Sequence, residues 1–203
     1  MSRDPIRAAT QFFGGRACLD FANTLDWRLT DEPVELIPDY KTLLSWSERR
    51  GTLSKRAVAS LRARSERRED EAQAVIDNAY KLRARIWRMA DDLRTGQPTD
   101  LRAFNRALAD LPPQPDLVPN GEAFVFDLDG ANLRQPLWPI LWSLSALLAS
   151  SDAMRLGSCQ AEGCGWFFVD ESPNHSRMWC SSEVCGNRER ARRAYAKRRS
   201  KAR

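Results

Sequence analysis

The sequence predicts an α+β protein with two parts: a mainly helical N-terminal domain that carries a small β-sheet, and a short cysteine-rich module. Three observations support this prediction. Apolar residues recur at helical spacing through most of residues 1–150, one short segment alternates as a strand does, and four of the five cysteines gather late in the chain. We therefore place the first domain at residues 1–150 and the second at residues 151–203, ending in a basic helix.

Apolar spacing and capping residues predict the first three helices. A short helix over residues 18–25 follows a glycine turn, and its apolar stripe makes Cys18 a buried small hydrophobe. A second helix begins at Pro38-Asp39 and stops at Gly51. Ser54 is expected to cap the third.

The clearest helix runs from about Glu69 to Arg94, where apolar residues keep a three-four spacing for six turns. Its other faces are charged, which indicates a surface helix with one buried side. Gly96 and Pro98 end it. Thr99 is expected to cap the next helix.

The rest of the first domain predicts one strand and one apolar helix. Residues 122–129 alternate as a strand, with Gly130 as its turn, and residues 137–149 form a mostly apolar helix. Five of the seven tryptophans lie in this domain. They could line an apolar ligand pocket, although core packing is the more frequent role of such residues.

Composition narrows the class of protein. Hydrophobic residues make up 42% of the chain and charged residues 29%, which is ordinary for a globular protein. No apolar run approaches the roughly 18 residues that a membrane span needs, and the N-terminus lacks the apolar core of a signal peptide. We therefore expect a cytoplasmic protein with no membrane partner, in which cysteines are more often metal ligands or free thiols than disulfides.

The charge is distributed unevenly. Residues 186–203 hold nine basic side chains and one acidic one, a net charge of +8, whereas residues 1–185 carry 23 basic and 26 acidic side chains, or −3. A basic end on a mildly acidic body indicates a polyanionic partner. A solvated, solubilising tail remains the alternative on charge alone.

The cysteine spacing predicts a structural zinc site formed by Cys159, Cys164, Cys180 and Cys185. Four residues separate the members of each pair, and fifteen residues lie between the pairs. Two short loops that each present two thiolates bring four ligands to one tetrahedral zinc ion. Four thiolates leave no open ligand position, so we expect a structural rather than a catalytic ion.

The sequence between and after the cysteine pairs fits that site. Residues 165–169 are expected to form a strand, 171–175 a turn and 177–179 the returning strand, while Ser181 or Ser182 caps a helix. The order of knuckle, β-hairpin and basic helix is the layout of a treble-clef zinc finger. A segment this short buries little core, so metal supplies most of its folding free energy.

Other uses of these cysteines are weaker predictions. Disulfides suit a secreted chain, and a redox switch would require the zinc site first. A site of three cysteines and His175 is conceivable, because His175 lies between the pairs.

The composition of residues 186–203 predicts a basic helix. Such a helix suits a phosphate backbone, and its arginines can reach guanine edges in a major groove. Some of these arginines, Arg177 and Arg188 in particular, could instead offset the −2 charge of zinc with four thiolates. The candidate nucleic-acid-binding residues are Arg177, Arg188, Arg190, Arg192, Arg193, Lys197, Arg198 and Arg199.

The segment Cys180-Ser-Ser-Glu-Val-Cys185-Gly-Asn-Arg188 resembles the signature of the CGNR zinc-finger family. Met178 stands where that pattern has a second arginine. Residues 14–24, Gly-Gly-Arg-Ala-Cys-Leu-Asp-Phe-Ala-Asn-Thr, resemble the opening of the ABATE domain, which accompanies this finger. The resemblance implies a bacterial transcription regulator, with a DNA-binding finger and an N-terminal domain that senses a ligand or stress.

DNA binding is the first functional hypothesis. The same charges would serve a module that binds structured RNA or the ribosome, and a protein-interaction domain with purely structural zinc is a third reading. We expect no enzyme, because the chain has one histidine, no glycine-rich phosphate loop and no Ser-His-Asp or His-Glu-x-x-His pattern. A small-molecule ligand and a homodimer are both compatible with the sequence.

Overall fold

The computed structural model describes residues 11–112 and 115–201. Its α-helices are α2 (Ala17–Ala22), α3 (Tyr40–Arg50), α4 (Lys55–Ser65), α5 (Glu69–Thr95), α6 (Arg102–Ala109), α7 (Trp138–Leu148) and α8 (Asn187–Lys201). Short 3-10 turns, η1 (Gln135–Leu137) and η2 (Ser151–Arg155), flank α7, and one π-helical turn, η3 (Ser182–Gly186), precedes α8. Within the described residues the strands form two-stranded antiparallel sheets: β1 (Leu25–Asp26) with β2 (Val34–Glu35), β3 (Leu117–Asn120) with β4 (Ala123–Phe126), and β5 (Leu156–Ser158) with β6 (Phe167–Val169). The predicted α+β class is confirmed.

Local capping explains where α3 and α4 begin and where α3 and α5 end. The Asp39 side chain accepts a hydrogen bond from the Thr42 N–H at 2.7 Å at the start of α3, and Ser54 caps α4 in the same way. Gly51 and Gly96 end α3 and α5 in the left-handed conformation, as predicted.

The helix after α5 begins later than the sequence predicted. Thr99 does not cap α6, which starts at Arg102. The Asp100 carboxylate accepts from the Arg102 N–H at 3.0 Å instead. This hydrogen bond forms a tight turn just before the helix, and α6 begins at Arg102 without a side-chain cap.

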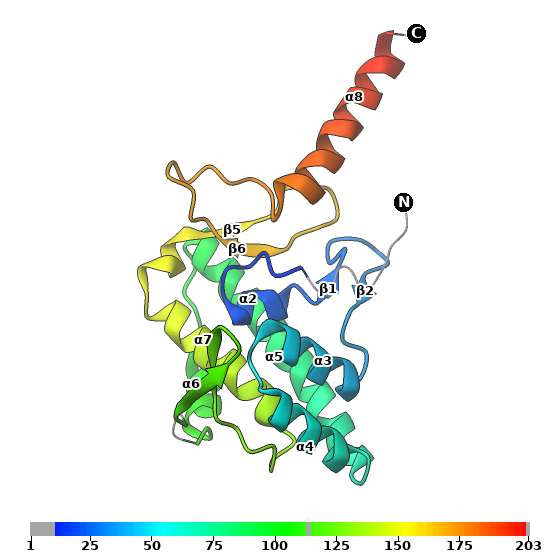
Figure 1. Cartoon of the computed structure of the whole chain (residues 1–203). Helices are drawn as coiled ribbons and strands as arrows, with labels where there is room; N and C mark the ends of the chain where they lie inside the picture. The colour runs from blue at the N-terminus through cyan, green and yellow to red at the C-terminus, as the bar shows by residue number, and fades with distance from the viewer. Residues whose placement is uncertain (1–10, 113–114, 202–203) are drawn as a thin grey trace.

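The long helix α5 lies along one side of the body, with one face buried and the others exposed. It packs against α2, α3 and α4, and α7 covers the other side of α2 (Figure 1). Trp46 is 1% exposed and Trp142 is 8% exposed within the core. These tryptophans are core residues, which is the more frequent of the two roles that the sequence left open.

The first domain contains a β-hairpin, and the sequence pattern predicted only one of its two strands. β4 lies inside the expected segment 122–129, and it pairs with β3, which the sequence did not indicate. Pro119 lies within β3 and lowers the strand signal there. Pro119 is tolerated because β3 has no second neighbour in the sheet.

The cysteine-rich module packs into the main core. Phe167 and Val169 of β6 are fully buried there. The side-chain amide of Asn23, at the end of α2, donates to the Phe167 carbonyl at 2.8 Å and accepts from the Phe167 N–H at 2.8 Å. The Val169 N–H donates to the Gly14 carbonyl at 3.0 Å. The two parts of the chain thus share one packed interior.

The expected β-hairpin differs from the one observed. β6 pairs with β5, which precedes the first cysteine pair, and residues 177–179 form no strand. The hairpin therefore encloses the first cysteine pair instead of following it. Hydrogen bonding favours this arrangement, because the Cys159 N–H continues the β5–β6 ladder to the Trp166 carbonyl at 2.8 Å.

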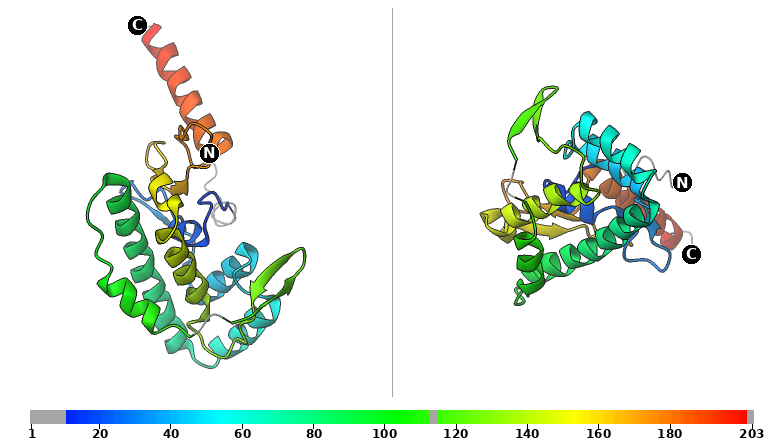
Figure 2. Two further views of the ribbon diagram at one scale, coloured as in Figure 1. Left: turned by 90° about the vertical axis from the view of Figure 1, so that its left-hand side faces the viewer. Right: turned by 90° about the horizontal axis from the view of Figure 1, so that it is seen from below.

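Helix α8 projects away from the body, and Figure 2 shows the same projection after a quarter turn. Among the described residues, no helix is both long enough and apolar enough to cross a membrane.

Candidate metal centre and basic helix

The four predicted ligands, Cys159, Cys164, Cys180 and Cys185, lie together at the base of α8. All their Sγ atoms lie within 4.8 Å of one another, with 3.9 Å between Cys164 and Cys180 and 3.4 Å between Cys180 and Cys185. Tetrahedral zinc with bonds of about 2.3 Å needs sulfur–sulfur distances of roughly 3.8 Å, so the cluster fits the ion. Bound zinc stabilises the fold there, because four thiolates leave no position for a substrate.

The state of the sulfur atoms also suits a metal. All four cysteines are buried and none forms a disulfide. Hydrogen bonds within the cluster lower the pKa of Cys159 and raise the pKa of Cys164 and Cys180, so four thiolates at this spacing require a cation among them. His175 lies outside the cluster, on an exposed turn, so the three-cysteine site with His175 is not formed.

Two glycines let the first cysteine pair dock on the N-terminal domain. Gly163 and Gly165 have φ of 78° and 68°, a region that L side chains rarely adopt. A Cβ at Gly163 would lie 2.6 Å from Cγ2 of Thr30, and one at Gly165 would lie 2.6 Å from Cγ of Leu29. The Leu29 N–H donates to the Gly163 carbonyl at 3.1 Å. The knuckle is therefore shaped to fit the turn at residues 27–30.

The second cysteine pair is positioned by the capped turn that leads into α8. The Ser181 hydroxyl accepts from the Val184 N–H at 3.2 Å, and the Ser181 carbonyl accepts from the Gly186 N–H at 3.0 Å. Cys185 lies in η3 between them. The expected cap at Ser181 is confirmed, and it places Cys185 directly below the basic helix.

An apolar layer from both parts of the chain surrounds the sulfur atoms. This layer excludes water from the thiolates and ties the metal site to the β1–β2 sheet. It consists of Leu36, Ala161, Trp166 and Phe168, with Phe13, Val34 and Trp179 at its edge.

Arg177 points into the protein, in contrast to the basic residues of α8. Its guanidinium stacks on the Phe168 ring, 4.2 Å from the centroid. All three guanidinium nitrogens donate to backbone carbonyls, namely those of Trp179 (3.0 Å), Val169 (3.2 Å), Phe13 (3.0 Å) and Cys180 (2.5 Å). These contacts do not favour the predicted nucleic-acid role of Arg177, and they assign it to the support of the metal loop, the alternative that the sequence had left open.

Arg188 also serves the metal centre. Its Nη2 lies 3.6 Å from the Sγ of Cys185 and 3.4 Å from the Glu162 carbonyl. Its guanidinium carbon lies 4.2 Å from the ring centroid of Trp27. The positive charge lies where it would offset the negative charge of a zinc–sulfur group, which favours the supporting role that the sequence had left open as the alternative to nucleic-acid binding.

Glu189 anchors α8, although no motif in the sequence predicted this role. This residue is 3% exposed. Its carboxylate accepts from the Glu162 N–H at 3.3 Å and from the Arg192 Nε at 3.1 Å, and Arg192 also pairs with the Glu162 carboxylate. The sequence does contain a signal for this role, because Glu189 is the one acidic residue in segment 186–203.

The remaining candidates divide into one tethered arginine and four exposed side chains. Arg190 donates to the Ser182 carbonyl at 3.2 Å and to Oδ1 of Asn187 at 2.5 Å. In the described part of the chain, no acidic group lies within ion-pair distance of the other four. These distal basic residues are Arg193, Lys197, Arg198 and Arg199, all exposed.

A buried four-thiolate centre at the base of a basic helix defines a zinc-finger protein. Comparison with protein families finds two matches. The family ABATE, described as "Putative stress-induced transcription regulator", matches residues 15–151. The CGNR zinc finger matches residues 155–198. The first match covers more than half of the chain, so the chain belongs to the ABATE family. A search of curated proteins finds no match.

Proposed function

We propose that this protein is a zinc-dependent, DNA-binding transcription regulator whose N-terminal domain senses a ligand or stress. DNA binding is supported by the way in which the basic residues of α8 differ between its two ends. Arg188, Arg190 and Arg192, in its first turns, bind protein groups, whereas the four distal basic residues are exposed. The description of the matched family supports the regulatory part.

The geometry of α8 suits a nucleic-acid groove. Its 15 residues span about 22 Å, and it stands clear of the body along most of its length. Like charges such as Arg193 and Lys197, four residues apart, destabilise the free helix, and phosphate groups relieve that repulsion. Arginine forks can also bind the O6 and N7 atoms of guanine in the major groove.

The metal centre gives this helix a fixed direction. The exposed side chains of α8 are arginines and lysines mixed with alanines, one tyrosine and small polar residues, and none is a large aliphatic residue, so no apolar stripe docks it on the core. Among the described residues, its first two turns are fastened to the metal loops, through Arg188, Glu189 and Arg192. Zinc is therefore needed for DNA binding without contacting the DNA.

Selection from a random duplex DNA pool tests the proposal. Zinc-loaded protein is compared with a variant in which Arg193, Lys197, Arg198 and Arg199 are all changed to Gln. The matched control changes three arginines and one lysine on exposed parts of the body to Gln: Lys55, Arg62, Arg88 and Arg106. We expect an enriched motif that the α8 variant loses and the control retains.

Salt dependence gives a second readout on the same proteins. If the four distal residues each neutralise one phosphate, the slope of log affinity against log salt becomes shallower by about 3.6 in the α8 variant. Competition with structured RNA separates the two nucleic acids. Absence of an enriched motif, or stronger binding to RNA, would contradict the DNA proposal. Loss of binding in the control variant would also contradict it.

A further inference from the structure

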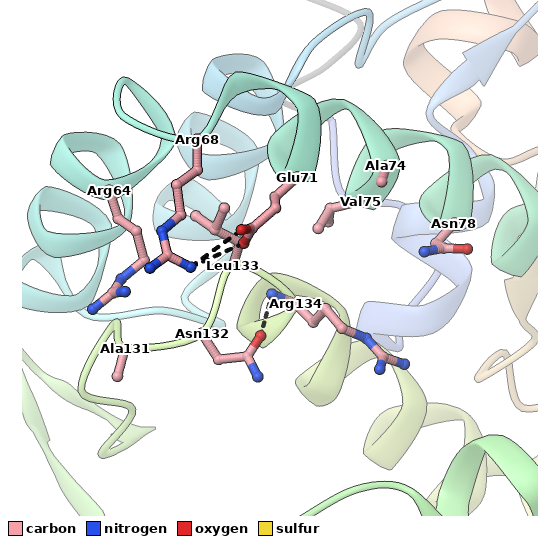
Figure 3. A pocket seen from close by; sticks show the side chains of 10 residues that line it. All are labelled: Arg64, Arg68, Glu71, Ala74, Val75, Asn78, Ala131, Asn132, Leu133 and Arg134. Carbon is pink, nitrogen blue, oxygen red and sulfur yellow. Dashed lines mark hydrogen bonds and ion pairs between the residues drawn. The ribbon is translucent and has the colours of Figure 1, made fainter.

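A basic cavity lies in the N-terminal domain between the end of α4, the first half of α5 and the loop at residues 131–134. It measures about 340 Å³, and Figure 3 shows the side chains that line it. Its charged residues are Arg64, Arg68, Arg134 and Glu71. A second hollow of about 330 Å³ shares Arg64 and Arg68 with it and adds Arg67.

The cavity has more positive charge than the protein itself balances. Glu71 binds Arg68 at 3.1 Å, and both side chains are more than half exposed, so that ion pair is weak. Among the described residues, Arg64, Arg67 and Arg134 have no acidic partner within ion-pair distance. The buried Nε of Arg64 also has no hydrogen-bond partner there. An anion in the cavity, beside Arg64 and Arg68, would balance part of this charge.

DNA bound to α8 does not account for this charge. Helix α4 lies at the end of the body opposite to α8 in Figure 1, and the left view of Figure 2 agrees. The cavity therefore needs a partner of its own.

The remaining lining fits a small organic molecule. Ala74, Val75 and Leu133 give the cavity an apolar wall, while Asn78 and Asn132 add amide groups (Figure 3). A volume of about 340 Å³ lies in the range of small-ligand pockets. Guanidinium groups bind both phosphate and carboxylate through paired hydrogen bonds, and several arginines together favour the phosphate monoester, which carries up to about two negative charges.

We propose that this cavity binds a small organic molecule carrying a phosphate group, with the phosphate on Arg64 and Arg68 and the organic part against Val75 and Leu133. The inference deepens the ligand-sensing role proposed above, and its test involves no DNA. Helix α5 links the cavity to the finger side of the domain, because Trp87 on α5 donates to the Ala22 carbonyl at 2.8 Å and lies under Arg28. Arg28 in turn donates to the Gly165 carbonyl at 2.8 Å.

Calorimetric titration of the full-length, zinc-loaded protein tests this site. The probes are adenosine monophosphate, ribose 5-phosphate, inorganic phosphate and adenosine, all at one ionic strength. We expect saturable binding of at least one of the two phosphate esters, weaker binding of inorganic phosphate and none of adenosine. Arg64→Gln should weaken binding of the ester by about tenfold to a hundredfold.

Arg62→Gln is the matched control, since Arg62 lies on the same helix and is exposed outside the cavity. Arg68→Gln provides a second test variant in case Arg64→Gln does not fold, since the Arg68 side chain is more than half exposed, and zinc content and melting temperature monitor folding. The proposal is overturned if neither phosphate ester binds saturably, if adenosine binds as tightly as its monophosphate, or if Arg62→Gln weakens binding as much as the cavity variants. DNA-binding results leave each of these outcomes unchanged.

Discussion

The guanidinium carbon of Arg188, in the first turn of α8, lies 4.2 Å from the ring centroid of Trp27 in the N-terminal domain. The same guanidinium lies 3.6 Å from the Sγ of Cys185. One side chain thus joins the basic helix, a metal ligand and the N-terminal domain. Its contacts hold the base of α8 to the N-terminal domain and to a metal ligand.

Arg188→Ala is expected to weaken zinc binding by roughly tenfold to a hundredfold, because it removes the positive charge and hydrogen bond beside Cys185. Competition for zinc with a chromogenic chelator measures the change. Arg193→Ala, further along the same helix, should leave zinc affinity unchanged. Equal effects of the two substitutions would show that the contact with Cys185 does not support the metal.

Removal of zinc should unfold α8 and the loops that carry the cysteines while α5 stays helical. The reason is that α8 lacks an apolar face, whereas α5 is buried along one side. Hydrogen exchange after chelation should therefore show fast exchange in residues 187–201 and continued protection in α5.

A pair of cysteine variants checks the same point without a chelator. Cys185→Ser should lose zinc, and Cys18→Ser should retain it, because Cys18 is buried in the main core away from the cluster. Burial raises the pKa of the Cys18 thiol to about 12, which keeps it neutral and unsuited to metal binding. Full protection of α8 in metal-free protein would contradict the proposed dependence on zinc.

Asn23→Ala is expected to lower the free energy of unfolding by about 2–5 kcal/mol. The substitution leaves the buried N–H and carbonyl of Phe167 without their partners, and each unsatisfied group costs about 1–3 kcal/mol. Urea denaturation measures the change. Asn105→Ala, at an exposed position on α6, should change stability by less than about 0.5 kcal/mol. A neutral Asn23 variant would mean that water replaces the amide.

Arg50→Ala should destabilise the protein in a pH-dependent way. The carboxylate of Asp20 is buried and accepts from Arg50 Nε at 2.6 Å and from the Gly14 N–H at 2.8 Å. Burial raises the pKa of Asp20 above 3.8, while Arg50 and the Gly14 N–H oppose the rise. Loss of Arg50 leaves an unpaired buried charge, at a cost of about 3 kcal/mol near neutral pH.

The sign of the pH dependence follows from the raised pKa. Folded protein lacking Arg50 holds the Asp20 proton more tightly than unfolded protein does, so the loss of stability grows as pH rises above about 4. Urea denaturation at several pH values, with Arg49→Ala as the exposed control, measures this trend. A loss that is constant with pH, or larger in acid, would contradict the assignment.

Local signals in the sequence were sufficient for most helices and for the metal ligands. Asp39, Ser54 and Ser181 cap the turns that they were expected to cap, because a capping hydrogen bond needs only residues within one turn. The paired cysteine spacing likewise predicted the cluster, since each pair lies in a short loop of its own. The strand β3 and the partner of β6 were missed or misassigned, because strand pairing depends on segments that are distant in sequence.

The sequence by itself determined that this protein has a four-cysteine zinc site, a mainly helical first domain and a basic final helix. Only the tertiary structure decided which basic residues remain available to a partner. Arg177 and Arg188 look like their neighbours in the sequence, yet carbonyls, a thiolate and aromatic rings from distant segments hold them. The arginine-lined cavity likewise could not be predicted from the sequence, because α4, α5 and the loop at 131–134 meet only after folding. The physical reason is that burial and choice of partner depend on contacts across the chain, whereas spacing and caps act within a few residues.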